Sequence, residues 1–290
     1  SMALFAQNTG AISGTVADAA DALLPNASVT LTNRGTGDVR EGATNGQGAF
    51  VFTPLQPGNY NLKVEAPGFR AYNRSGIVLN LNDRIGLPTI NMQIGATGES
   101  ITVEATATQI ETVSAERSGI VTGRQIVDIA VNGRNYTTLF KTIPGATLEG
   151  GFGGNANING ARSTSNNFTV DGQNVTDTGV NTQFAYRINL DSIQEFKVTT
   201  NSAAAEFGRN SGAQIQVATK SGTNQFHGTG WWFKRGEFMN ANDFLNNMNG
   251  RARPIYRFMQ TGWNFGGPVT IPGTPLNGKD KLFFFASNEW

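Results

Sequence analysis

The sequence predicts a mainly β protein with three parts: a seven-stranded β-sandwich, an α+β domain, and the first strands of a transmembrane β-barrel that stays incomplete. Three observations support this prediction. Short segments of alternating apolar and polar residues recur about every ten residues between Pro-Gly and Asn-Gly turns, as in antiparallel sheets. Charged residues make up only 15% of the chain and 36 of its 290 residues are glycine, which favours strands and turns over helices. All four tryptophans follow Gln225.

The composition argues against several classes of function. The net charge is +1 and there is no long basic run, so the footprint of a nucleic-acid-binding protein is missing. There is no cysteine and only one histidine, His227, so we predict no metal site and no cofactor. No two carboxylates have a spacing that suggests acid and base roles. We therefore predict that the chain is not an enzyme and has no catalytic residues.

Residues 1–7 are left out of the predicted fold. The apolar run Met2–Ala6 before Gln7 is typical of the end of a signal peptide, with Ala6 as the small residue before cleavage. The dipeptide Ser1-Met2 suits a cloning tag equally well. No stretch of about 18 apolar residues occurs anywhere in the chain, so no membrane-spanning helix is predicted.

Residues 8–97 are predicted to form the β-sandwich. Alternating segments begin at Gly10, Ala27, Ala49 and Tyr60, and turns such as Pro57-Gly58 separate them. The segment is similar to the carboxypeptidase regulatory-like domain, whose pattern is met at Gly14, Val16, Pro25, Ala27, Val29, Leu31, Thr44, Gly48, Phe50, Phe52, Leu55, Pro57, Gly58, Tyr60, Leu62, Val64, Gly68 and Phe69. That resemblance implies a non-catalytic interaction or scaffolding module. Asn45 stands where the family usually has Asp, which puts cation binding at this turn in doubt.

Residues 98–118 are predicted to be a partner-binding segment and a linker. The β-branched run resembles the Ton box, the strand by which TonB-dependent outer-membrane receptors are gripped from the periplasm. Its residues are Glu99, Ser100, Ile101, Thr102, Val103, Glu104 and Ala105. An exposed extended segment of this kind binds by adding a strand to the edge of the partner's sheet. The alternative is that the run is simply the last strand of the sandwich.

Residues 119–224 are predicted to be the α+β domain. Apolar residues three and four apart predict a short helix over 122–130 and a second one over 136–140. The segment 213–219 alternates almost perfectly, which predicts a strand with one buried and one wet face. Four short motifs follow one another: Asp171-Gly172, Ile193–Val198, Phe207-Gly208 and Thr219–Gly222. Their order resembles the plug domain of TonB-dependent receptors, although Tyr is commoner than Phe at position 207.

Two further features of this domain extend the resemblance. The motif Asn132-Gly133-Arg134 is similar to a turn near the start of plugs of the Oar-like subgroup. The loops at 150–157 and 174–183 are predicted to face a ligand. Their candidate residues are Gly151, Phe152, Asn155, Asn174, Asp177, Asn181 and Gln183. The Gly-rich stretch 150–155 does not open a helix after a strand, so nucleotide binding is not predicted.

Residues 225–290 are predicted to be the first strands of the barrel. Half of the chain's aromatic residues lie here, in segments of about ten residues separated by polar loops, as at the start of an outer-membrane barrel. Three strands are too few to close a barrel, since even the smallest need about eight. The alternative is an ordinary core or an exposed adhesive sheet, because Phe283-Phe284-Phe285 breaks the alternation.

The resemblance implies a function for the complete protein. It implies an outer-membrane receptor of a Gram-negative bacterium whose sandwich lies in the periplasm and whose barrel contacts outer-membrane lipid. It further implies import of a small ligand, such as a saccharide, a peptide or a metal chelate, driven by a TonB-type energy-coupling protein. The alternative is a structural or adhesive protein at the cell surface that self-associates through strand edges, which recruit other chains when left unpaired. The sequence does not distinguish a natural end at Trp290 from a truncation.

Overall fold

The computed structural model describes residues 9–95, 100–104, 114–129, 131–148, 156–177, 179, 188–204, 207, 211–270, 273 and 277–290. The chain divides into two compact units, Ser1–Lys220 and Ser221–Trp290. The predicted remnant at residues 1–7 lies outside the described residues. No helix in the described part of the chain is long and apolar enough to cross a membrane.

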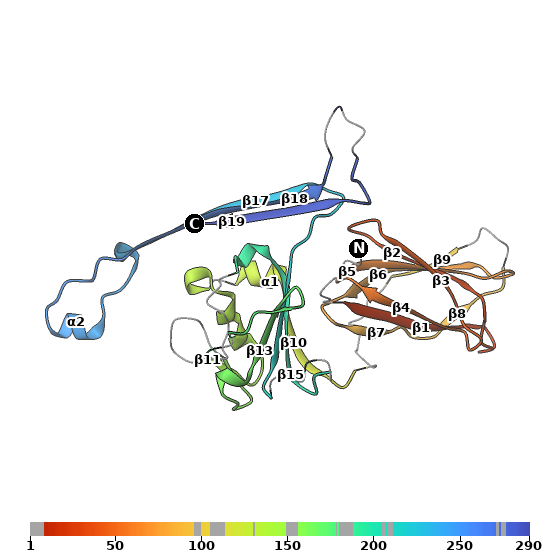
Figure 1. Cartoon of the computed structure of the whole chain (residues 1–290), viewed down its shortest axis with the longest axis horizontal. Helices are drawn as coiled ribbons and strands as arrows, with labels where there is room; N and C mark the ends of the chain where they lie inside the picture. The colour runs from red at the N-terminus through yellow and green to blue at the C-terminus, as the bar shows by residue number, and fades with distance from the viewer. Residues whose placement is uncertain are drawn as a thin grey trace. The chain divides into compact units, whose positions relative to one another are not determined.

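The first unit begins with two sheets that enclose one apolar core (Figure 1). Its strands are β1 (Gly10–Asp18), β2 (Ser28–Asn33), β3 (Val39–Ala43), β4 (Ala49–Leu55), β5 (Gly58–Glu65), β6 (Ala71–Leu79), β7 (Arg84–Gly86), β8 (Ile90–Met92) and β9 (Ser100–Glu104). One sheet has the order β4-β1-β7, with β8 also paired to β1, and the other has the order β3-β2-β5-β6-β9. Alternate residues such as Val29, Leu31 and Leu62 are almost fully buried, as expected of strands with one face in a core.

The predicted sandwich is confirmed, but it has more strands than the seven expected. The segment after β6 splits into the short strands β7 and β8, which pair in parallel with separate parts of β1. Asn45 has a structural role in its turn, because its Oδ1 accepts hydrogen bonds from the amides of Gln47 and Ala49, both at 2.9 Å. An Asn side chain that closes its own turn in this way stabilises it without a cation.

The second part of this unit is a five-stranded sheet covered by short helices (Figure 1). Its elements are β10 (Arg117–Thr122), α1 (Gly123–Asp128), the 3₁₀ helices η1 (Asn132–Arg134), η2 (Tyr136–Thr142), η3 (Ser163–Ser165) and η4 (Leu190–Ser192), and the strands β11 (Ala146–Leu148), β12 (Ala156–Ile158), β13 (Asn167–Val170), β14 (Gln173–Asn174), β15 (Ile193–Asn201) and β16 (Gln214–Thr219). The sheet order is β10-β15-β16-β13-β14. Both predicted helices are present, the second as a 3₁₀ helix.

One face of this sheet carries the domain's apolar core. Phe168, Phe196 and Val217 pack with residues of η2, and the rings of Phe140 and Phe196 meet edge to face at 5.5 Å. The Asp171-Gly172 motif forms the turn that joins β13 to β14. Asp171 (φ 47°) and Gly172 (φ 79°) both have a positive φ, as a two-residue type I′ hairpin requires.

The opposite face of the sheet corrects the prediction for 213–219. Gln214 and Gln216 of β16 were expected to be wet, but each is only 2% exposed. They share their face with other buried polar residues, because directly paired residues of neighbouring strands point to the same side. We call this set the polar face: Asn167, Thr169, Glu195, Lys197, Thr199, Gln214 and Gln216. Alternation shows which residues share a face, but it does not show what covers that face.

The second unit is an antiparallel sheet of three strands, β17 (His227–Gly236), β18 (Arg257–Pro268) and β19 (Phe283–Glu289). The connection between β17 and β18 contains η6 (Glu237–Met239) and the short helix α2 (Phe244–Met248). Figure 1 shows these strands as one long ribbon, with α2 in the connection that extends from its end. Within the described residues β17 and β19 are both edge strands, which is consistent with the predicted incomplete barrel.

Candidate functional site

The predicted partner-binding segment forms β9, the edge strand of the sandwich. Ser100–Glu104 pairs in parallel with Ala71–Ser75 of β6. Ile101 is half-buried and Val103 is 39% exposed. Glu99 and Ala105 lie outside the described residues. The segment is therefore extended, as a Ton box needs to be. It is also the last strand of the sandwich, as the alternative predicted.

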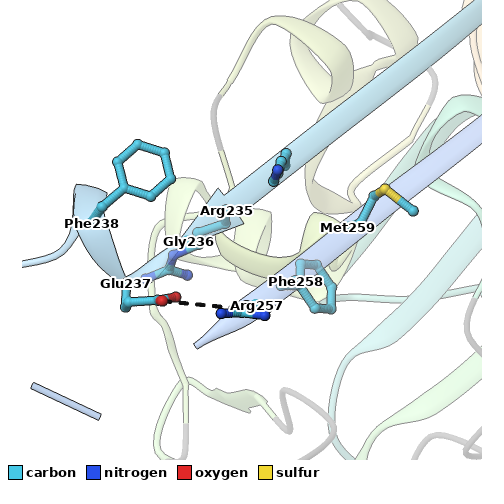
Figure 2. A pocket seen from close by; sticks show the side chains of 8 residues that line it. Arg235, Gly236, Glu237, Phe238, Arg257, Phe258 and Met259 are labelled. Carbon is cyan, nitrogen blue, oxygen red and sulfur yellow. Dashed lines mark ion pairs between the residues drawn. The ribbon is translucent and has the colours of Figure 1, made fainter. Parts of the chain in front are cut away.

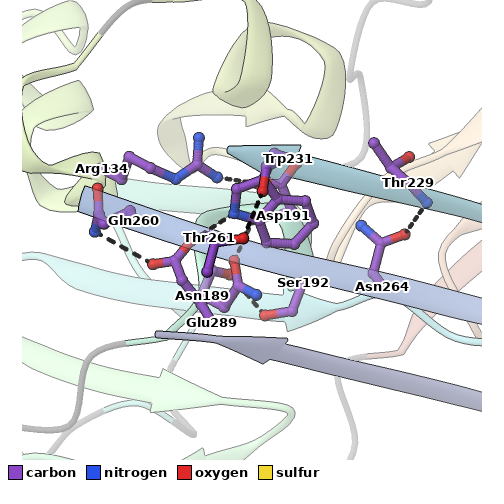
Figure 3. A network of polar contacts seen from close by, with 10 residues as sticks. All are labelled: Arg134, Asn189, Asp191, Ser192, Thr229, Trp231, Gln260, Thr261, Asn264 and Glu289. Carbon is purple, nitrogen blue, oxygen red and sulfur yellow. Dashed lines mark hydrogen bonds and ion pairs between the residues drawn. The ribbon is translucent and has the colours of Figure 1, made fainter. Parts of the chain in front are cut away.

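The motifs of the second domain meet at one buried carboxylate. Arg134 of the Asn-Gly-Arg turn forms an ion pair with Asp191, and their side chains are only 11% and 8% exposed (Figure 3). Asp191 also interacts electrostatically with Lys220. Burial lowers the pKa of this lysine, and the negative charge of Asp191 opposes that shift. Asp191 thus links the turn at 132–134, the start of β15 and the end of β16.

A second link explains why the Asp-Gly motif and the Thr-Lys motif occur together. The carboxylate of Asp171 accepts hydrogen bonds from the Thr219 amide at 2.8 Å and from the Thr219 hydroxyl at 2.7 Å. The turn after β13 is therefore fastened to the end of its parallel neighbour β16. These contacts hold the sheet in register, and a structural role accounts for the motif without a bound ligand.

The polar face contains a buried lysine that contacts two carboxylates from distant parts of the chain. Lys197 is fully buried, and its Nζ lies 3.1 Å from Oδ1 of Asp83 and 3.6 Å from Oε2 of Glu116. Asp83 belongs to the turn between β6 and β7 of the sandwich, and Glu116 immediately precedes β10. A buried lysine needs such partners, because an unpaired charge is very costly to bury.

Glu195 lies on the same face and has an unusual environment. Its pKa is raised to about 7, mainly by burial. The charge of Asp83 contributes to this rise, and the hydrogen bond from the Leu81 backbone and the charge of Lys197 oppose it. Its Oε1 is buried with no hydrogen-bond partner among the described residues. The prediction of functional residues missed this cluster. The signal was present, because Glu195 and Lys197 are charged residues on either side of Phe196 in a run that reads as a strand.

The predicted ligand-facing loops are described only in part. Gly151, Phe152, Asn155, Asn181 and Gln183 lie outside the described residues. Asn174 is exposed and bonds locally, donating to Asn167 Oδ1 at 3.0 Å and accepting from the Thr176 amide at 2.8 Å. Asp177 accepts from the Gly179 amide at 2.6 Å. The role of these two residues in binding a ligand stays a prediction.

The three strands of the second unit present two different faces. On one face, Glu289 accepts hydrogen bonds from the indole of Trp231 at 3.2 Å and from the amide of Gln260 at 3.4 Å (Figure 3). On the other face, Phe265 packs at 5.9 Å from Phe226 and at 5.5 Å from Phe284. A polar face opposite an aromatic face is expected of strands between a lumen and lipid. Phe233 and Phe285 interrupt the polar side.

A cavity of about 430 Å³ lies where β17 ends and β18 begins (Figure 2). It combines cationic and apolar side chains, and Glu237 Oε1 is 3.9 Å from Arg257 Nε. The lining residues are Lys234, Arg235, Gly236, Glu237, Phe238, Arg257, Phe258 and Met259. None of them was a predicted site residue.

Three family models match this architecture in the order in which its parts occur. The Carboxypeptidase regulatory-like domain matches residues 11–93, the TonB-dependent Receptor Plug Domain matches 104–213, and the Outer membrane beta barrel domain matches 218–290. A sandwich, a plug and barrel strands in one chain define the class. These matches confirm the predicted resemblance to TonB-dependent outer-membrane receptors and the predicted fold class, and they support an outer-membrane location.

The similarity extends along nearly the whole chain to one curated protein. The TonB-dependent transporter Oar of Myxococcus xanthus is 31% identical over 301 residues, which cover 98% of this chain and 27% of that protein. The chain thus spans about a quarter of this relative's length.

Two solved structures are similar over part of the chain. The siderophore receptor PirA from Acinetobacter baumannii is 18% identical with a TM-score of 0.43, covering 59% of this chain and 24% of that one. PirA from Pseudomonas aeruginosa is 17% identical with a TM-score of 0.37, covering 53% and 26%. Likenesses this partial carry no conclusion about function.

Proposed function

We propose that the complete protein imports a ligand across the outer membrane, with the domain at 119–224 as its gate. A TonB-type periplasmic protein supplies the energy by gripping the segment from Glu99 to Ala105. The sandwich lies in the periplasm, the barrel strands contact lipid, and the chain has no catalytic activity. The ligand is a saccharide, a peptide or a metal chelate, contacted by the loops at 150–157 and 174–183.

The observation that supports this proposal best is the position of β9. It is an extended strand of five residues between the sandwich and the plug, and it ends the sheet order on its side. A strand at the end of a sheet has one row of main-chain groups without a neighbouring strand. Such a strand suits recognition by β-augmentation, in which the main chain supplies affinity and alternate side chains supply specificity.

The test is binding of the purified periplasmic domain of the TonB-type protein to the full-length receptor in detergent. We expect Val103→Pro to weaken binding by about tenfold or more, because proline removes a ladder donor and its ring obstructs pairing. Val103→Ala keeps the amide and is the matched control, for which we expect a smaller loss. Equal affinity of the proline variant and the unmodified receptor would contradict the assignment of this segment.

A further inference from the structure

The pairing of β9 with β6 places the candidate partner-binding strand on a surface of the same chain. We define the β6 edge as Ala71–Ser75, the residues that pair with Ser100–Glu104. Both pairing modes, with β6 and with an outside sheet, use the main chain of the same five residues. The question is whether a partner adds to the docked strand or has to displace it.

The β6 edge fits this segment in length. Beyond Ser75, β6 is interrupted by a bulge, because Ser75 and Gly76 together oppose the single residue Asn61 of β5, and Gly76 has a φ of 76°. A bulge bends and twists a strand away from regular pairing. The regular part of the edge therefore ends where the pairing with β9 ends.

The docked strand contributes little to the sandwich itself. The buried core of the sandwich consists of residues between Ile12 and Met92, and none of its members belongs to β9. In contrast to the strands of the core, β9 has no described residue that is fully buried, and Thr102 is exposed. Because the buried core contains no residue of β9, we expect β9 to be released without unfolding the domain.

The side chains of β9 decide between addition and displacement. Ile101 and Val103 lie on the same face, because alternate residues of a strand share a face. Ile101 pairs with Tyr72, which packs against the sandwich core, and Ile101 is itself half-buried there. A partner that reads the side chain of Ile101 needs the part of this face that the sandwich half covers, while Val103 on the same face is 39% exposed.

We propose that the β6 edge is an intramolecular docking site for the segment Ser100–Glu104, and that the sandwich and the periplasmic partner compete for this one strand. This inference rests on the proposed function of the segment. Docking lowers the apparent affinity for the partner, since only the undocked fraction of molecules is competent to bind. The sandwich thereby keeps the segment paired with β6 until a partner of sufficient affinity displaces it.

A disulfide across the two strands tests the competition. Asn73 and Thr102 are direct neighbours on β6 and β9, and the chain has no cysteine of its own. In the full-length receptor, Asn73→Cys with Thr102→Cys is expected to oxidise readily and to lock the strand in place. The matched control is Thr30→Cys with Glu41→Cys, which joins the directly paired strands β2 and β3 of the same sheet.

Binding is measured with the purified periplasmic domain of the TonB-type protein. We expect the oxidised Asn73/Thr102 variant to bind at least tenfold more weakly than its reduced form, and the control pair to bind equally in both forms. A free peptide of residues 98–107 should bind more tightly than the reduced receptor, because it has no docking site to leave.

Three outcomes would overturn the inference. Failure of the Asn73/Thr102 pair to oxidise would show that the strands do not pair. Equal binding of the oxidised and reduced forms would show addition to the docked strand, and would leave the proposed function intact. If neither the peptide nor the reduced receptor binds the partner, the proposed role of the segment is wrong, and so is the proposed competition.

Discussion

Glu195 allows a prediction whose sign is opposite to that of most buried carboxylates in ion pairs. The side chain is 4% exposed, and burial raises its pKa from 4.5 to about 7. Below pH 4.5 the group is protonated in both the folded and the unfolded chain. As the pH rises from 4.5 to about 7, the unfolded chain loses its proton first, so the stability contributed by Glu195 is lost across this window and stays lost above it.

The magnitude follows from the two pKa values. At about 1.4 kcal/mol per pKa unit, the difference between 4.5 and about 7 corresponds to about 3 kcal/mol of folding free energy. Glu195→Gln has the same shape and does not ionise. We expect it to match the unmodified protein at pH 4 and to be more stable by up to about 3 kcal/mol at pH 8. For a unit of this size the melting temperature should rise by roughly 6 to 12 °C.

The assay is thermal unfolding of the fragment that ends at Lys220, followed at pH 4, 6 and 8. The control is Glu65→Gln, an exposed glutamate of β5 paired with Lys63 at 2.9 Å, for which we expect a change below about 0.5 kcal/mol. Parallel stability curves for Glu195→Gln and the unmodified fragment would refute the reasoning. They would show that this carboxyl is not desolvated, and hence that the polar face is open to water.

Three further predictions address the same unit. Lys197→Met should destabilise the fragment by about 3 kcal/mol in urea unfolding, because Asp83 and Glu116 would lose their buried cationic partner. An unchanged urea midpoint would show that these contacts do not stabilise the fold. Asp171→Ala should cost about 1 to 2 kcal/mol in the same assay, because both bonds to Thr219 are lost, and a silent substitution would remove the link between the two motifs. A fragment that ends at residue 222 should stay monomeric without detergent by gel filtration, because the aromatic strands lie beyond it; aggregation would assign those strands to a soluble core.

The sequence predicted most of the fold because turns and alternation are local properties. Asp and Gly readily adopt the positive φ angles that a two-residue hairpin requires, and Asp171-Gly172 has these angles in the structure. Similar local turn residues indicated the spacing of the sandwich strands. The extra strands β7 and β8 were missed because each has only three residues. Such short runs show no periodicity, and they become strands through parallel pairing with β1, which is a non-local contact.

The candidate site was harder to predict, because its chemistry depends on contacts between distant residues. Alternation correctly grouped Gln214 and Gln216 on one face, but sequence reasoning had to assume that a polar face is a wet face. Lys197 refutes that assumption, since its partners Asp83 and Glu116 lie far away in the sequence. Similarly, the run at 100–104 favoured both an exposed strand and a sandwich strand. Which of the two applies depends on whether the β6 edge offers a place for it.

The two carboxylates at Lys197 place β9 inside a closed loop of chain. Asp83 precedes β9 in the sequence, Glu116 follows it, and both contact the same buried Nζ. The sandwich end and the plug end of the intervening chain are therefore fixed to one point on β15. A strand within such a loop can leave the β6 edge while both ends of the loop stay anchored. Release of β9 from β6 and separation of Asp83 and Glu116 from Lys197 are consequently separate steps. Strand pairing opposes the first, and the buried ion pairs oppose the second. Lys197→Met should weaken only the second, so oxidation of the Asn73/Thr102 cysteine pair should proceed equally well in its presence.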